Sequence, residues 1–422
     1  MAFPGAGPGG NFLEQMLGDL MKLMGGPASG GARIDLARAL AQGVASEGET
    51  EANPDPVERI RIEELVHVAE LHVAEVTGLS ATPTGSSMEV AAVGRGGWAW
   101  QTVEDWRFLL DAMSSTPQTG AAADTDAPTA AAPDAGTATR PPGLGLTDLG
   151  DDVEPAPPGS ADVLGRWLAT MGPVLSAVQL ASAVGHLART TLGPYEIPIP
   201  RPGHKLLIVP ANVARFAEEW SLDPDEVRLW VCLRSVTTHT VLSKPHVSER
   251  VRELLVRVVE GMTEEASSLT DRFNDLDFTE PDSLQRLLGD PDALFAVESS
   301  PARRRAADDL SAVAVALVGY VEHVLDGTAS RLLGNHGAIA EAWRRRQVDR
   351  EGPARSAEQM VGLDLSPAQT DRGAAFVRGV LERAGEQGLA RLWSAARALP
   401  TPAEIDAPGL WLERIDLSTN DG

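Results

Sequence analysis

The side chains that could do chemistry lie on a helix that the sequence predicts over residues 223–242. Asp223 is a favourable N-cap, and Glu226 three residues later completes a capping-box pattern. Further along, Arg234 and Thr238 are one turn apart and interrupt an otherwise apolar stripe. A guanidinium on a buried face needs an acidic partner. The sequence therefore predicts that a carboxylate from elsewhere in the chain holds Arg234.

Two segments resemble a known family. The run RLWVCLRSVTTH, residues 228–239, resembles the zinc-binding helix of the actinobacterial zincin-like metallopeptidases, which are labelled as associated with deazaflavin-coenzyme biosynthesis. The run PYEIPIPRPG, residues 194–203, is similar to the same family, and the resemblance is closest over residues 162–325. It implies a mainly α, zincin-like metallopeptidase fold with very few short strands. We expect KLLIVPAN, residues 205–212, to contain one of these strands.

The resemblance also implies where a zinc site would lie. The family's helix carries H-E-x-x-H, and the shared register places Arg234, Ser235 and Thr238 at the first His, the Glu and the second His. The family's third ligand, a Glu before a glycine, corresponds to Val318. Zinc needs imidazole or carboxylate donors, which a protonated Arg, a hydroxyl and an alkyl group do not supply. We therefore predict no catalytic residue and no bound cofactor at these positions.

A rearranged metal site is the alternative, with His239, His323 and Glu322 as candidate ligands. His239 follows Thr238 directly, which turns its side chain about 100° from the expected ligand face. Glu322 is one turn beyond Val318 and could approach Arg234 across the helix pair. We expect Glu322 or Asp326 to hold Arg234, whose charge then takes the place of the metal ion.

Composition excludes several classes of protein. The chain has 36 basic and 60 acidic residues among 422, and the net charge of −24 argues against nucleic acid as a partner. The one cysteine, Cys232, excludes an internal disulfide and is expected to be a buried apolar residue of the central helix. No P-loop, Rossmann, G-x-S-x-G or C-x-x-C motif is present. We find no signal peptide or transmembrane run of about 18 apolar residues, and expect a cytoplasmic protein.

The pattern along the chain predicts one helical body interrupted by a linker. The glycine-rich GRGGW, residues 94–98, is expected to form a turn, and Trp98, Trp100 and Trp106 are expected to anchor the core. The predicted divisions are a flexible tail with a short amphipathic helix at 1–33, an N-terminal helical part at 34–115, a disordered acidic Ala/Pro/Thr linker at 116–161, a zincin-like helical core at 162–415 and a tail at 416–422.

These observations leave three hypotheses about function. The first is a protein that has lost its zinc site and uses the remaining cleft to bind a peptide or protein partner, or as a scaffold. The second is a zinc-dependent hydrolase with the rearranged metal site. The third is an interaction module in which the linker and the N-terminal tail bind a partner and the helical body supports them.

Overall fold

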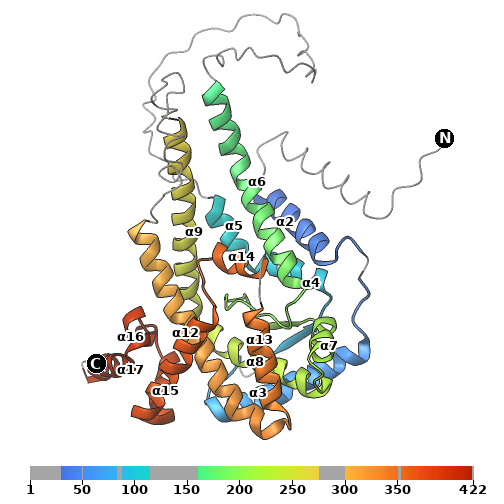
Figure 1. Ribbon diagram of the computed structural model, residues 1–422, viewed down its shortest axis with the longest axis vertical. Coiled ribbons are helices and arrows are strands. Elements are labelled where there is room, and N and C mark those ends of the chain that lie inside the picture. Colours follow the sequence, from blue (N-terminus) through green and yellow to red (C-terminus); the bar gives the residue numbers. More distant parts are fainter. Residues whose placement is uncertain are drawn as a thin grey trace, which may run out of the picture.

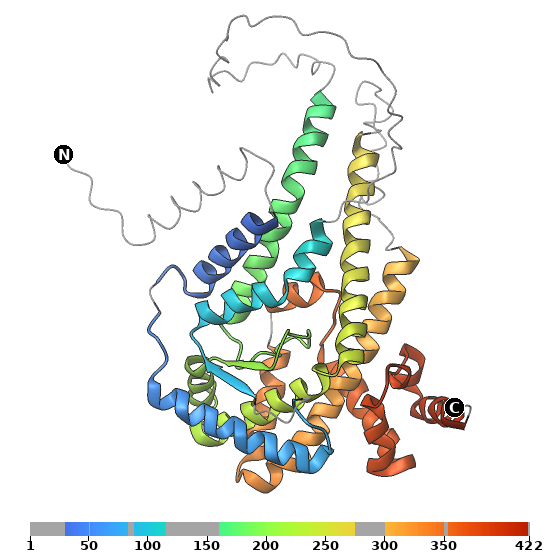
Figure 2. The same ribbon diagram turned by 180° about the vertical axis from the view of Figure 1, so that it is seen from behind.

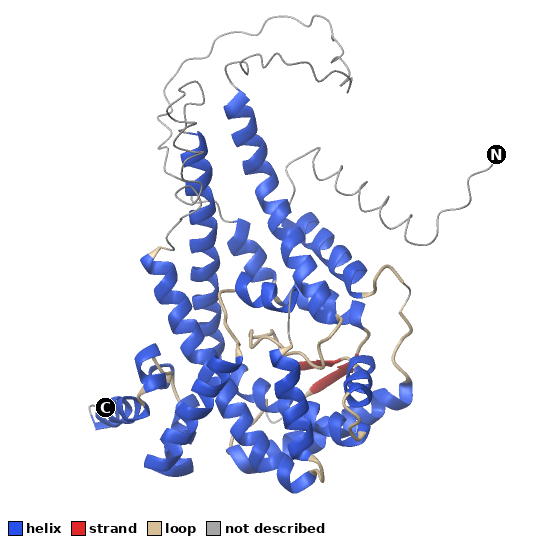
Figure 3. Cartoon of the chain, viewed as in Figure 1, coloured by secondary structure: helices blue, strands red, loops and turns tan. Residues whose placement is uncertain are grey.

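The computed structural model describes residues 30–49, 51–82, 88–114, 160–274, 300–349 and 353–420. Its regular structure is almost entirely helical, with two short strands (Figure 3). The mainly α fold with very few short strands expected from the sequence is therefore confirmed. The elements of the first half are α2 (Gly30–Ala45), α3 (Pro56–Thr77), β1 (Glu89–Ala92), α4 (Arg95–Asp105), α5 (Arg107–Ser114), α6 (Ser160–Ala188), β2 (Lys205–Ile208) and α7 (Pro210–Glu219).

The second half supplies the elements around the site. They are α8 (Pro224–Leu242), α9 (Pro245–Asn274), α12 (Pro301–Leu332), α13 (His336–Val348), α14 (Pro353–Met360), α15 (Pro367–Ala390), α16 (Pro402–Asp406) and α17 (Pro408–Asn420), with 3-10 turns at Arg391–Trp393 and Ala396–Ala398. Helix α17 continues through residues 416–420, which we expected to be a tail. The predicted amphipathic helix at the N-terminus and nearly all of the predicted linker lie outside the described residues.

Helix α12 is the central element and contacts α3, α8, α9 and α15 (Figures 1 and 2). The apolar residues that recur along it at intervals of three and four are buried: Leu310, Val313, Leu317, Val321 and Val324. Among the described residues, α12 alone is long and apolar enough by composition to cross a membrane, but 67% of its most apolar window is buried inside the protein. Its apolar residues therefore pack the interior of the fold.

The two sides of the predicted linker belong to one packed body. Helix α2, which precedes it, packs along α6, which follows it, and α4 also contacts α6. The close approach needs a glycine, because a Cβ at Gly185 would lie 2.8 Å from the carbonyl oxygen of Ala41. Each side alone would leave an apolar helix face uncovered.

The start of α8 is capped differently from the prediction. Asp223 accepts hydrogen bonds from the backbone amides of Asp225 and Glu226, as an N-cap should. The Glu226 carboxylate does not close the capping box; it accepts from the amides of Gly334 and Asn335 at 2.9 and 3.0 Å. Glu226 therefore ties the start of α8 to the loop between α12 and α13.

The glycine-rich segment at residues 94–98 opens α4 instead of forming a turn. The Glu51 carboxylate accepts hydrogen bonds from the amides of Arg95 and Gly96 at 2.8 and 3.0 Å, so a side chain of the protein satisfies this helix end. Before it, β1 pairs in parallel with β2, with residue 89 opposite residue 205. Only the second of these strands was expected from the sequence.

Two of the three tryptophans near α4 are core residues. Trp98 and Trp106 are buried, as predicted, whereas Trp100 is 42% exposed and lies under the guanidinium of Arg38. The prediction for Trp100 was wrong because it lies two residues from Trp98 on a helix, which points the two rings in different directions.

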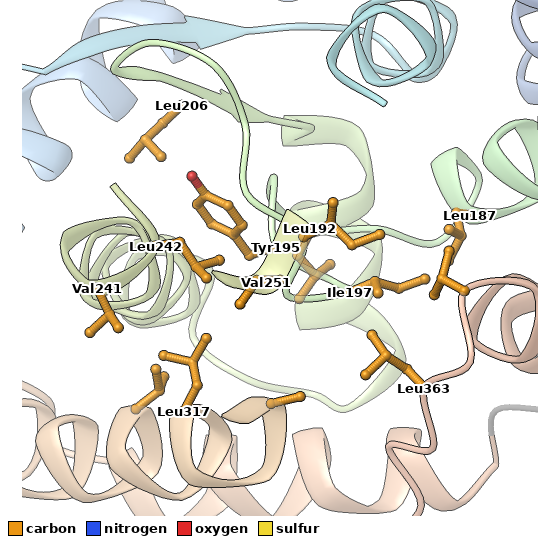
Figure 4. Close-up of a cluster of buried hydrophobic side chains, with 14 of the residues drawn as sticks. Leu187, Leu192, Tyr195, Ile197, Leu206, Val241, Leu242, Val251, Leu317 and Leu363 are labelled. Carbon is orange, nitrogen blue, oxygen red and sulfur yellow. The ribbon is translucent and has the colours of Figure 1, made fainter. Parts of the chain in front are cut away.

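Residues 194–203 run through the interior toward the site. Figure 4 shows Tyr195 and Ile197 in one buried cluster with Leu242 of α8 and Leu317 of α12. The segment is held by the buried Arg201, which donates to the Asp105 carboxylate at 2.7 Å, and to a hydroxyl and a backbone carbonyl. This segment is thereby fixed beside α8.

Candidate functional site

A cavity of about 340 Å³ lies where α8, α12, α13 and α15 meet. Its apolar wall comes mainly from α12 and its polar groups come from all four helices and from residues 194–203. The lining side chains that matter for its chemistry are Glu196, Arg234, Thr238, Leu317, Val318, Val321, Glu322, Asp326, Trp343, Arg344, Asp371 and Arg378. The residues of α8 and α12 that the sequence singled out, among them Arg234, Thr238, Val318 and Glu322, therefore line one cavity.

Arg234 lies at the α8 side of this cavity. Its guanidinium carbon is 4.5 Å from the ring centroid of Trp343 and 5.8 Å from that of Trp230. A second cation, Arg346, has its guanidinium carbon 5.0 Å from the same Trp343 ring centroid. A guanidinium stacked on an indole face gains a cation–π attraction and keeps its in-plane N–H donors at the rim. Trp343 therefore packs against the Arg234 guanidinium at the cavity wall.

Glu322 faces the same cavity from α12, one turn after Val318. Burial raises the pKa of its carboxyl, and the nearby Arg234 and Arg344 offset only part of this effect. Asp326 and Asp371 add to the increase because they are like charges. Among the described residues, no hydrogen bond or ion pair joins Glu322 to another side chain. The charge of Arg234 lowers the pKa of the Glu322 carboxyl through space, but no ion pair between the two is among the described contacts, so the predicted holding of Arg234 by Glu322 is not seen.

Two other acids of the cavity contact basic side chains outside its lining. Asp326, the second expected partner of Arg234, is 2.9 Å from the Nε2 atom of His336. Glu196 is 3.0 Å from Arg346, which also donates to a backbone carbonyl. The basic cluster at residues 344–346 is therefore divided: Arg344 and Arg345 pair with the exposed Glu341, and Arg346 is packed beside Trp343.

Ser235 and Thr238 are buried, and their side chains contact other groups of the protein. The Thr238 hydroxyl donates to the Arg234 carbonyl at 2.9 Å, as hydroxyls inside helices commonly do. Ser235 packs on Gly193, where an added Cβ would lie 2.7 Å from the serine Oγ. Val318 contributes an alkyl group to the cavity wall. Cys232 is buried as expected, and burial raises the pKa of its thiol to about 12.

The two candidate histidine ligands do not meet. His239 is buried, with its Nδ1 atom 2.7 Å from the Tyr195 hydroxyl and its Nε2 atom 3.4 Å from His204. Burial, and to a lesser extent His204, lower the pKa of His239 to about 4, so the ring is neutral near pH 7. His323 lies instead beside Glu386 at 3.1 Å. Within the described ranges, no group of three His, Cys, Asp or Glu side chains is arranged to hold a metal.

Trp343, Tyr195 and His204 are residues of this region that the sequence did not single out. Trp343 is separated from Arg234 by more than a hundred positions, and no periodicity links the two. Tyr195 and His204 lie in or next to the run PYEIPIPRPG, whose similarity to the metallopeptidases was the only signal that marked them.

Comparison with known proteins identifies the family. The sequence profile of the zincin-like metallopeptidases matches residues 33–412, almost the whole length. The chain belongs to the zincin-like metallopeptidase family. No curated protein matches it. Among solved structures, this zincin-like chain is similar to a protein from Chloroflexus aurantiacus, described as a candidate hydrolase with a novel fold, at 20% identity and a TM-score of 0.55. The match covers 90% of this chain and 97% of the other, and at this identity shows a shared fold.

Zinc is the metal that the zincin-like fold implies, and the side chains at residues 234, 235, 238 and 318 do not fit it. The stacked guanidinium of Arg234 is a permanent cation without a lone pair to donate. The hydroxyl of Thr238 is already bonded to the backbone, and Val318 has no donor atom. A zinc ion beside Arg234 would also meet charge repulsion.

Proposed function

We propose that this zincin-like protein has lost its zinc site and acts as a non-catalytic binding or scaffold protein, with a peptide or protein partner in the cavity between α8 and α12. The observation that carries the proposal is the placement of Arg234, stacked at 4.5 Å on Trp343 at the wall of that cavity. The position where relatives are expected to hold a metal ligand thus presents a fixed positive charge. Hydrolysis by zinc requires the metal ligands and the general base together. The side chains at residues 234, 235, 238 and 318 supply neither a zinc ligand nor a general base.

The cavity suits binding because it is lined by both apolar and polar side chains. Leu317, Val318 and Val321 of α12 give the cavity an aliphatic lining, and Trp343 and Arg234 add an aromatic and a cationic group from α13 and α8. Ligand sites commonly combine such an apolar wall with a few polar groups that orient the ligand. A partner side chain could therefore bury apolar surface on α12 while its polar atoms meet α8 and α13.

A zinc hydrolase with a rearranged site is the competing hypothesis. Its ligands would include His239 and His323, but these side chains contact Tyr195 and Glu386 respectively and neither lines the cavity. The third hypothesis, binding through the linker and the N-terminal tail, rests on segments that lie mostly outside the described residues. An actinobacterial origin, a cytoplasmic location and a link to deazaflavin coenzymes stay predictions from the sequence.

Metal analysis tests the loss of the zinc site. The chain is purified without chelators and its zinc content is measured by mass spectrometry, together with hydrolysis of a quenched-fluorescence peptide library. We expect far less than one zinc per chain and no hydrolysis. The matched control restores the family's residues with Arg234→His, Ser235→Glu, Thr238→His and Val318→Glu, and should bind zinc. One zinc per wild-type chain, with hydrolysis that a chelator abolishes, would contradict the proposal.

A further inference from the structure

Helix α3 has an apolar stripe on its outward side. It packs against α8 and α12 and buries residues along its inward side: Ile62, Val66, Ala69 and Val73. Five large apolar side chains of α3 are exposed, more than on any other helix of the described residues: Val57, Ile60, Val68, Leu71 and Val76. At about 100° per residue, all of these except Val76 fall on the side of the helix opposite the buried one. Figure 2 shows α3, in blue, at the lower end of the body on the side turned to the viewer. A continuous apolar patch of this kind marks an interaction surface.

Two polar side chains lie near the middle of this stripe. Glu64 is exposed, and within the described residues its carboxylate forms no hydrogen bond or ion pair. His67 is also exposed, with its Nδ1 atom 3.7 Å from the Glu70 carboxylate, which accepts a hydrogen bond from the Met88 amide. Glu70 thus lies beside one nitrogen of the imidazole, and the other nitrogen, Nε2, is available to a carboxylate of another molecule.

The order of residues along the stripe is self-complementary. From the N-terminal end, steps of three and four lead from Val57 to Ile60 and Glu64. From the C-terminal end, the same steps lead from Ala74 to Leu71 and His67. A second copy of α3 packed antiparallel would meet the first over about 26 Å in three pairs, each repeated by the twofold axis: Val57 with Ala74, Ile60 with Leu71, and Glu64 with His67. A parallel copy would place Glu64 against Glu64, which is repulsive. The charges therefore favour an antiparallel second copy as the occupant of this face.

We propose that two copies of this chain associate through α3, packed antiparallel about a twofold axis that passes between the two Glu64–His67 pairs. The outer pairs bury apolar surface, and the central pairs each join a carboxylate acceptor to an imidazole donor. Such a contact uses the same patch on both copies, as most homodimers do. No residue of α3, which is described over its whole length, lines the cavity beside Arg234, so the dimer presents two identical cavities. The inference goes beyond the proposed function and does not depend on it.

Sedimentation equilibrium of the full chain tests the contact. We expect a monomer–dimer equilibrium between about 1 and 100 µM. Leu71→Arg should weaken association about a hundredfold or more, because the twofold axis removes a buried leucine from each copy and adds two unpaired cations. Leu417→Arg is the matched control and should leave association unchanged, since Leu417 of α17 is 67% exposed and Leu71 is 61% exposed. A wild-type chain that stays monomeric at about 100 µM, or equal dissociation constants for the two variants, would overturn the inference.

Cysteine cross-linking tests the antiparallel order. Val57→Cys combined with Ala74→Cys should give a disulfide-linked dimer when the chain is oxidised with diamide, whereas Val57→Cys alone should stay monomeric on a non-reducing gel. The two positions are about 26 Å apart on one helix, so a disulfide between them can only join two copies. Cys232 is buried and does not compete. Adding Leu71→Arg to the double variant should abolish the cross-link. Efficient cross-linking of the single variant, or none of the double variant, would refute antiparallel packing.

Discussion

Helices α12 and α15 cross at a contact that only glycine permits, and this contact sets one wall of the cavity. A Cβ at Gly319 would lie 2.4 Å from the carbonyl carbon and oxygen of Gly373, and a Cβ at Gly373 would lie 2.2 Å from the Val315 carbonyl oxygen. These neighbours are backbone atoms, so they cannot turn away as a side chain would. Gly319→Ala must therefore push α15 off α12.

The size of the effect follows from two opposing contributions. Alanine is favoured over glycine inside a helix by roughly 1 kcal/mol, and overpacking a close contact costs about 1–3 kcal/mol or more. Gly327 lies on the same helix with no atom within 4 Å of an added Cβ, so Gly327→Ala has only the favourable contribution. We expect the unfolding free energies of the two variants to differ by about 1–3 kcal/mol, with Gly319→Ala the less stable.

Urea unfolding followed by circular dichroism measures this difference, with both variants and wild-type protein treated in parallel. The expected order of stability is Gly327→Ala, then wild type, then Gly319→Ala. If the two alanine variants unfold at the same urea concentration, the close crossing of α12 and α15 is refuted.

Two further predictions concern buried polar groups. Asp105→Asn should lower the unfolding free energy by about 3–5 kcal/mol, because it leaves the buried Arg201 cation uncompensated; a decrease below about 1 kcal/mol in urea unfolding would show that this ion pair is not buried. Because the folded pKa of His239, about 4, is below its ordinary 6.5, the unfolded chain takes up this proton first as pH falls. Wild-type protein should therefore lose about 3 kcal/mol more than His239→Gln between pH 6.5 and pH 4, and equal losses in the two proteins would contradict a buried neutral ring.

The sequence by itself determined the helical fold, the buried face of α12 and the start of α8. The spacing of apolar residues along α12 predicted which face is buried, and the cap at Asp223 predicted where α8 begins. The similarity of RLWVCLRSVTTH and PYEIPIPRPG to one family predicted the fold that the profile match confirms. Local rules suffice here because helix periodicity and caps depend on neighbours within a few residues.

Only the tertiary structure decided how the polar groups are paired. Glu226 fits a capping box by its spacing, yet it accepts hydrogen bonds from two amides of the loop after α12. Arg234 and Trp343 come together only when α13 folds back on α8, and Asp326 is taken by His336 from the start of that same helix. Pairings of this kind join residues far apart in the chain, and the packing of whole helices, which no local pattern encodes, sets their distances.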